Sequence, residues 1–307
     1  MPAFTAKDVA ELRKQTGCGM MDCKNALVAA DGDFDAAIKV LREKGMAASA
    51  KKQSRIAAEG LVSILTEGEL TAMIEVNIES DFAAKTDAFR EFVAGLLRTV
   101  LAASPADVEA LKACAYDGTS DTVEQVLQEK TYKIGEKISI RRFVVVRGTV
   151  STYVHGTGVT GVVISFDTDL AAHPAFAEFA KNIALQAAAY NTPYLSRETV
   201  PASVLEEEKN ILKVQMSQDP KMAGKPEKVL EGIINGKLGK FYENNCLLEM
   251  PYVKDDSLTV AKYVQQSAKE MGGRIAVTGF VRYDKGEGIE KREDDLAAEV
   301  AKMVGGK

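Results

Sequence analysis

The chain has 307 residues, of which 46 % are apolar and 27 % charged, and its formal net charge is −5. Such a composition is typical of a soluble globular protein with room for two domains or more. The acidic balance does not favour a nucleic-acid or membrane surface, where a basic patch would be expected. No apolar run approaches transmembrane length, and the first eight residues lack the features of a signal peptide.

The cysteines and histidines form no motif that would bind a metal or perform catalysis. Cys18 and Cys23 are five positions apart rather than in a CxxC pair, and His155 and His173 are the two histidines. No GxSxG motif occurs, and neither histidine has an evident catalytic partner. We therefore expect no catalytic residues, no metal and no cofactor. Scattered cysteines predict free buried thiols, which suits a reducing cytoplasm.

Residues 1–46 predict a module of three short helices. Thr5 can cap the first, a Gly-rich break at 16–19 separates the second, and Asp33 can cap the third, which Gly45 is expected to end. The third helix has apolar residues at i, i+3, i+4 and i+7: Phe34, Ala37, Ile38 and Leu41. So small a core predicts a docking role rather than a catalytic one. Residues 47–56 are expected to form a polar linker, helical or flexible.

Residues 70–85 predict a strand that leads into a short connection. Over residues 70–78 every second residue is apolar, and all but one of the residues between them are polar. This alternation predicts a strand with one buried face, made of Leu70, Ala72, Ile74, Val76 and Ile78. A helical pattern begins at Phe89. Ser80 or Asp81 could cap the next helix, with Phe82 packed against it as a staple. Alternatively, the connection displays a carboxylate and an aromatic ring for function.

An internal repeat relates two parts of the chain. Segments near 60–63, 80–84 and 88–92 match segments 87 or 88 positions later, and Gly135–Val144 matches Gly272–Val281. Each copy is expected to contain two strands, a helical segment and a third strand. A period this long with two copies predicts two related α+β subdomains with small antiparallel sheets, at 57–147 and 148–291.

The second copy carries an insertion at about 201–241. Two amphipathic stretches joined by Gly224-Lys225-Pro226 predict an antiparallel helical hairpin. Its apolar stripe could pack on itself, on the body of the protein, on a partner, or on a second copy of the chain in a homodimer. A last amphipathic helix is expected over 292–307.

The segment 156–161 matches GxGxxG but is not expected to bind a dinucleotide. That fingerprint requires a helix to start within it, whereas strand-forming residues follow here: Val162, Val163, Ile164 and Phe166. A hairpin turn between two strands fits the pattern better. A nucleotide-dependent oxidoreductase, the alternative function that this motif suggests, would need a strand–turn–helix at 153–166.

Four stretches resemble signatures of the bacterial elongation factor Ts family: Leu12–Leu27, Glu75–Lys85, Ile134–Arg142 and Gly286–Lys291. They occur in the family's order, and the resemblance covers nearly the whole chain. The second signature usually reads Thr-Asp-Phe, and Ser80 here keeps the hydroxyl of that threonine. The resemblance implies a ubiquitin-associated-like N-terminal module followed by two related subdomains, with a helical hairpin in the second.

The same resemblance implies a guanine-nucleotide exchange factor for elongation factor Tu, acting in the cytoplasm during translation elongation and protein biosynthesis. It would bind Tu in its GDP-bound and nucleotide-free forms, and would make or break no covalent bond. The residues that the family uses at the nucleotide site correspond to Ser80, Asp81, Phe82 and His155. Those of the N-terminal docking surface correspond to Arg13, Met20, Met21 and Lys24. An alternative is a non-catalytic adaptor, for which Asp81 and Phe82 would be dispensable.

Overall fold

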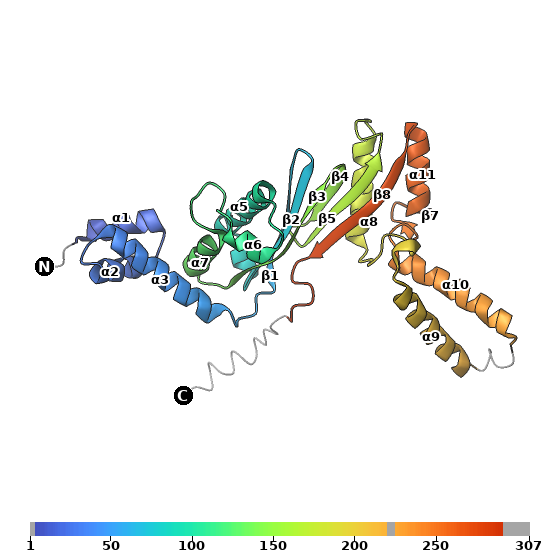
Figure 1. Cartoon of the computed structure of the whole chain (residues 1–307), viewed down its shortest axis with the longest axis horizontal. Helices are drawn as coiled ribbons and strands as arrows, with labels where there is room; N and C mark the ends of the chain where they lie inside the picture. The colour runs from blue at the N-terminus through green and yellow to red at the C-terminus, as the bar shows by residue number, and fades with distance from the viewer. Residues whose placement is uncertain (1–3, 220–224, 291–307) are drawn as a thin grey trace. The chain divides into compact units, whose positions relative to one another are not determined.

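The computed structural model describes residues 4–219 and 225–290 (Figure 1). The chain divides into two compact units. The first contains the chain up to Val145, together with Gly156–Thr160 and the part that begins at Tyr283; the second contains Val146–His155 and Gly161–Arg282. The domain boundaries predicted from the sequence stay predictions.

The N-terminal part of the first unit is a three-helix module: α1 (Ala6–Thr16), α2 (Met20–Ala29) and α3 (Phe34–Lys52). Thr5 and Asp8 form a capping box at the start of α1, and the Asp33 side chain caps α3. The helices bury a small apolar core whose largest members are Leu12, Leu27 and Leu41.

The prediction that Gly45 ends the third helix is wrong, because α3 continues to Lys52. Gly45 is buried, and a side-chain carbon there would lie 3.7 Å from Cβ of Tyr132. Glycine at this position therefore permits close packing against the helix that carries Tyr132, α7 (Val123–Ile134). The ion pair between Arg42 and Asp121, 3.0 Å long, joins the same two parts of the unit.

A three-stranded sheet in the order β1-β2-β3 forms the body of the first unit. Strand β1 (Glu59–Glu67) pairs antiparallel with β2 (Leu70–Ile78), and β3 (Ile138–Arg147) lies on the other side of β2. Between β2 and β3 the chain forms α4 (Asp81–Ala84), α5 (Asp87–Ala103), α6 (Val108–Ala113) and α7. The apolar stripe of α5, which includes Phe89 and Phe92, packs in one core with the alternate apolar residues of β2.

The prediction of a single buried face on β2 is too limited. All residues from Thr71 to Ile78 are buried, including Glu75 and Asn77 on the face that alternation assigned to solvent. Glu75 is buried because arginines of β3 and the segment near Gly286 cover it with hydrogen-bond donors.

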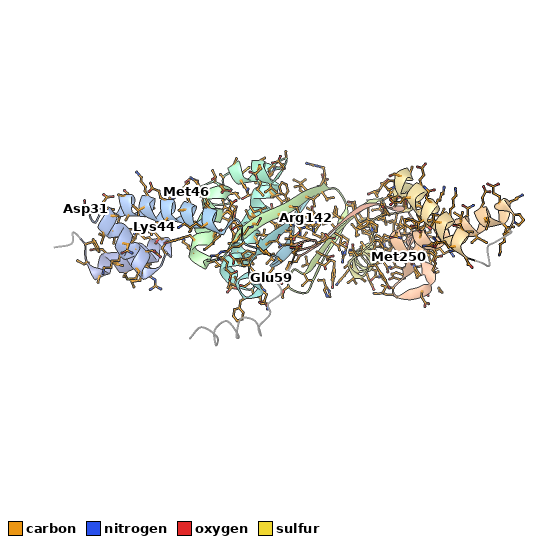
Figure 2. The ribbon with its side chains drawn as sticks, turned by 90° about the horizontal axis from the view of Figure 1, so that it is seen from below. Asp31, Lys44, Met46, Glu59, Arg142 and Met250 are labelled. Atoms are coloured by element: carbon orange, nitrogen blue, oxygen red, sulfur yellow. The ribbon has the colours of Figure 1, made fainter. Side chains whose placement is uncertain are left out.

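The second unit repeats this arrangement. Strands β4 (Val150–His155), β5 (Thr160–Thr168) and β8 (Ile275–Asp284) form a sheet in the order β4-β5-β8. Its helices include α8 (Phe176–Ala189) and α11 (Val260–Met271), with a short pair β6 (Pro251–Tyr252) and β7 (Asp255–Thr259) between them. Figure 2 labels Met250, which is buried in this second core. The predicted α+β class with two related subdomains is thus confirmed.

Matching glycines end the helix before the third strand of each copy. Gly135 follows α7 with φ 84°, and Gly272 follows α11 with φ 76°, both in the left-handed region that favours glycine. The internal repeat therefore extends to the caps of its helices.

The insertion is the predicted helical hairpin, made of α9 (Ala202–Gln218) and α10 (Glu227–Asn245), which follow a 3-10 turn, η1 (Arg197–Thr199). Its helices pack on each other through Leu212, Met216, Ile234 and Leu238. The hairpin thus buries one stripe by itself, and a homodimer through it stays a prediction. The predicted helix over 292–307 lies outside the described residues. Within 4–219 and 225–290, no helix is both long and apolar enough to cross a membrane.

Candidate functional site

The connection after β2 is a single helical turn, α4, capped by Ser80. The Ser80 hydroxyl accepts a hydrogen bond from the backbone N–H of Ala83 at 3.2 Å. Thr86, not Asp81, caps the following helix α5. The alternative that Asp81 is a cap is therefore wrong, and its carboxylate accepts no helix-capping hydrogen bond from α5.

Glu136 fixes the cap residue from outside the connection. Its carboxylate accepts the Ser80 hydroxyl at 2.6 Å and the Ser80 backbone N–H at 2.9 Å. Hydrogen bonds to an ionised carboxylate are among the stronger ones in proteins. One residue earlier, the Glu79 carboxylate accepts the backbone N–H of Lys137 at 2.5 Å and a bond from Arg55 at 3.2 Å. The end of β2 is thus held at two successive residues.

Asp81 is exposed and paired with a lysine on its own turn. Lys85 Nζ donates to Asp81 Oδ2 at 2.6 Å, four residues along the chain. The pKa of Asp81 is lowered, chiefly by this hydrogen bond and by the positive charge of Lys85. The carboxylate therefore remains ionised at neutral pH and is accessible to a partner.

Phe82 is the most exposed large apolar side chain in the described chain, with 84 % of its surface accessible. It is therefore not a hydrophobic staple against α5. The next two residues, Ala83 and Ala84, are buried in the first core and anchor the turn. An aromatic ring that is held in water by an anchored turn is unusual in a folded protein, and it marks a candidate contact for another macromolecule.

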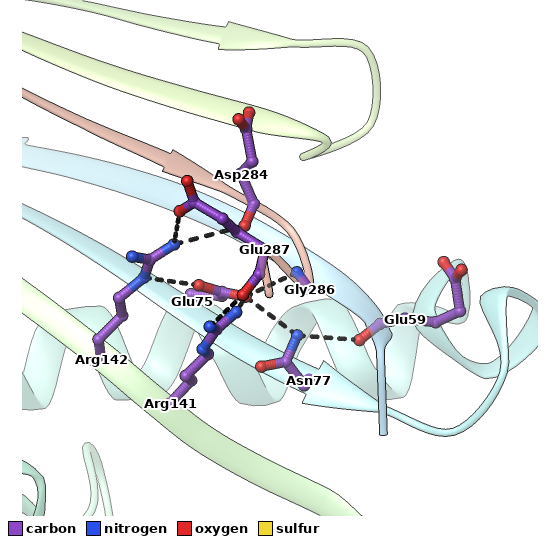
Figure 3. A network of polar contacts seen from close by, with 8 residues as sticks. All are labelled: Glu59, Glu75, Asn77, Arg141, Arg142, Asp284, Gly286 and Glu287. Carbon is purple, nitrogen blue, oxygen red and sulfur yellow. Dashed lines mark hydrogen bonds and ion pairs between the residues drawn. The ribbon is translucent and has the colours of Figure 1, made fainter. Parts of the chain in front are cut away.

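A buried carboxylate, Glu75, anchors the strand that leads to this turn (Figure 3). It accepts hydrogen bonds from Arg141 Nη1 at 3.0 Å, Arg142 Nε at 2.7 Å and the backbone N–H of Gly286 at 2.8 Å. The Asn77 amide adds a fourth bond at 3.1 Å. Because every side of the carboxylate is paired, its negative charge is tolerated without exposure to water.

The predicted docking residues of the N-terminal module are all exposed. Met20 and Met21 have 45 % and 62 % of their surface accessible, so neither belongs to the core. Arg13 and Lys24 are exposed as well. Met46, labelled in Figure 2, adds another exposed thioether on α3. Methionine side chains adapt to the shape of a contacting surface.

His155 is exposed at the end of β4. Its Nδ1 lies 3.0 Å from the hydroxyl of Tyr153. Asp81 and Phe82 belong to the first unit and His155 to the second, so they are two separate candidate contacts.

The GxGxxG segment joins β4 to β5, so it is a turn between strands and not the start of a helix. A side-chain carbon on Gly158, which has φ 98°, would lie 2.6 Å from Cβ of Leu61. The Gly158 carbonyl accepts the backbone N–H of Val62 at 2.8 Å. Gly158 thus permits the turn to lie close to β1. Because the segment is a turn between strands, the oxidoreductase alternative is excluded. Within the described chain, no group of three or more His, Cys, Asp or Glu is arranged to hold a metal.

Sequence reasoning assigned no site role to Glu136, Glu75 or Lys85. Glu136 lies in the stretch Ile134–Arg142 that resembles a family signature, and that resemblance was the signal that could have identified it. Glu75 and Lys85 lie in the stretch Glu75–Lys85, which also resembles a family signature, but the alternation along the strand places Glu75 on the solvent face.

Comparison with known proteins agrees with these features. The family described as "Elongation factor TS" matches residues 79–287. A protein named elongation factor Ts from Syntrophotalea carbinolica is 46 % identical over 304 residues, covering 98 % of this chain and 99 % of its own. Proteins of the same name from Clostridium kluyveri and Symbiobacterium thermophilum are each 44 % identical, covering 99 % of this chain and 100 % and 99 % of their own.

Proposed function

The chain belongs to the elongation factor Ts family, and on that basis we propose that it is a guanine-nucleotide exchange factor for elongation factor Tu. It would act in translation elongation, in the cytoplasm, and without covalent chemistry. The observation that supports this proposal most is the display of Phe82 and ionised Asp81 on a single turn held by Glu136. Both side chains are exposed on a short helical turn, which fits contact with a partner.

The chemistry of the turn fits a site that holds a nucleotide through Mg²⁺ and phosphates. A carboxylate brought near a phosphate-bound Mg²⁺ competes for the ion and repels the phosphate oxygens. An aromatic ring wedged between helices shifts the loops that those helices position. We assign the first role to Asp81 and the second to Phe82. In the free protein Lys85 occupies the carboxylate of Asp81, so insertion would exchange this exposed ion pair for partner contacts.

Linkage explains how such a protein would accelerate exchange. If it binds nucleotide-free Tu more tightly than Tu–GDP, it must weaken GDP binding by the same factor. GTP would then enter the intermediate complex and displace the factor. The factor itself makes or breaks no covalent bond in this cycle.

The N-terminal module would supply affinity at a distance from the nucleotide. Exposed Met20 and Met21 offer apolar area on α2, and exposed Arg13 and Lys24 place positive charge on the same module. His155 would provide a contact from the second unit.

The direct experiment is release of a fluorescent GDP analogue from purified elongation factor Tu, followed after mixing with excess unlabelled GDP. The proposal predicts that stoichiometric amounts of this protein accelerate release. Release at the unassisted rate would refute the proposal. Acceleration that persists in both Asp81→Ala and Phe82→Ala would instead favour the adaptor alternative for this turn.

A further inference from the structure

The residue after the shared aspartate is exposed in one copy of the repeat and packed inward in the other. Phe82 follows Asp81 in the first copy and is 84 % exposed. Leu170 follows Asp169 in the second copy and packs, partly buried, against the second core. The same position of one structural unit thus points outward in one copy and inward in the other.

The residue after the helix-ending glycine differs between the copies in a way that explains this contrast. Glu136 follows Gly135 in the first copy, whereas Gly273 follows Gly272 in the second. A side-chain carbon on Gly273 would lie 2.7 Å from Cδ2 of Leu170 and 2.6 Å from Oδ1 of Asp169. With a side chain at position 273, Leu170 and Asp169 would have to move from the positions that they hold.

The hydroxyl at the end of the second strand of each copy, Ser80 after β2 and Thr168 in β5, also makes different hydrogen bonds in the two copies. Ser80 donates to Glu136 and accepts from the N–H of Ala83, three residues on, which starts the helical turn α4.

The equivalent Thr168 donates to the carbonyl of Arg274 and accepts from the N–H of Leu170, two residues on. That pattern makes a tight turn without a helix, and the next helix, α8, begins at Phe176.

We propose that Glu136 is a positioning residue, and that its contact with Ser80 selects the helical turn that displays Phe82 outward. If residue 136 had no carboxylate, the first copy could adopt the tight turn of the second copy. The ring of Phe82 would then turn inward and lie over residue 136. The inference rests on the proposed function for what Phe82 does to a partner. Its conformational part concerns this chain alone.

The chain has no tryptophan, so Phe82→Trp places a single fluorescent reporter at the displayed position. With Glu136 present, we expect long-wavelength emission and efficient quenching by acrylamide. In the background of Glu136→Gly, which copies the second repeat, the emission should shift to shorter wavelength and quenching should fall at least twofold. Glu136→Gln keeps the length but loses one of the two accepting oxygens, so it should give an intermediate result. Glu109→Ala, which removes an exposed carboxylate on α6, is the matched control and should change neither signal.

The same Glu136 substitutions are then compared in the chain that retains Phe82, by release of fluorescent GDP from Tu. Glu136→Gly should slow exchange about tenfold or more, the scale expected when a charge-assisted hydrogen bond that holds an active conformation is lost. Glu136→Gln should recover part of the rate.

The two readouts separate the two claims. Unchanged emission and quenching in both Glu136→Gly and Glu136→Gln would overturn the positioning role, whatever happens to exchange. If Glu136→Gly does not fold, as judged by circular dichroism, Glu136→Gln carries the test. A change of reporter signal, with no acceleration of GDP release by the unsubstituted protein, would support the positioning role and refute the exchange function.

Discussion

Oε2 of Glu75 accepts a hydrogen bond from Nε of Arg142 at 2.7 Å, and the Glu75 side chain is fully buried. Arg142 also pairs with Glu287 at 3.0 Å and lies over the ring of Tyr283, 4.1 Å from its centroid. One buried carboxylate on β2 thus ties β3 to the segment that follows β8, as Figure 3 shows. The strand that leads to the turn with Asp81 and Phe82 is held by electrostatics as well as by its sheet bonds.

This relationship predicts a large loss of stability for Glu75→Ala. The substitution removes the buried carboxylate that two partly buried arginines share, and breaking a buried ion pair from one side costs about 3–5 kcal/mol. Urea unfolding measures the difference. Glu287→Ala is the matched control, because it removes an acceptor of the same Arg142 at an exposed site and should cost less than about 1 kcal/mol. Equal losses for the two variants would show that burial of Glu75 is not what matters.

The glycines of the 156–161 turn are predicted to differ in tolerance. Gly158→Ala forces a carbon to 2.6 Å from Leu61 and should destabilise the protein by about 2 kcal/mol or more. Gly156→Ala meets nothing nearer than 3.6 Å and should cost about 1 kcal/mol, which is the effect of its positive φ alone. Thermal unfolding of the two variants provides the comparison. A larger loss for Gly156→Ala would contradict the close approach to β1.

Exchange through Asp81 is predicted to be independent of pH between about 6 and 8. Lys85 lowers the pKa of the Asp81 carboxylate in the folded protein. The contribution of this negative charge to the stability of the fold is therefore present above the unfolded pKa. That contribution is lost only as the pH falls through the folded pKa, in the acidic range. The ratio of exchange rates for the unsubstituted protein and Asp81→Asn should therefore be constant across that range. A ratio that changes severalfold would mean that another titrating group controls the step.

Much of this architecture could be predicted from the sequence, because the relevant signals are local. The alternation over 70–78 coincides with β2, and the internal repeat predicted two related α+β subdomains, each with its own small sheet. Strand-forming residues after 161 correctly argued against a dinucleotide site.

The missed features depend on contacts between distant residues. The alternation along β2 places Glu75 on the solvent face, because the local pattern cannot show arginine partners that lie 66 and 67 positions away. The local pattern predicts a helix end at Gly45, because it cannot show the packing of Tyr132 against that glycine. The position of Phe82 depends on Glu136, 56 residues from the cap that it holds. Such pairs become evident only when the fold brings them together.

Met21→Ala is predicted to weaken binding of Tu without weakening the fold. The side chain is 62 % exposed, so the free energy of unfolding should change by less than about 0.5 kcal/mol. The concentration of this protein needed for half-maximal GDP release should rise severalfold, while the maximal rate stays the same. Leu27→Ala, in the core of the same module, is the contrast and should reduce stability by about 2–5 kcal/mol. An unchanged half-maximal concentration for Met21→Ala would remove this residue from the docking surface.

The most direct measurement is the rate at which fluorescent GDP leaves elongation factor Tu in the presence of the unsubstituted protein, Phe82→Ala or Leu170→Ala. Phe82 is exposed and Leu170 packs on a core, so Phe82→Ala should unfold at the same urea concentration as the parent and Leu170→Ala at a lower one. The account predicts that Phe82→Ala nonetheless loses most of the acceleration, while Leu170→Ala, at a temperature where it remains folded, keeps it. Equal and small effects of the two substitutions on GDP release would contradict the assignment of this turn as the exchange site.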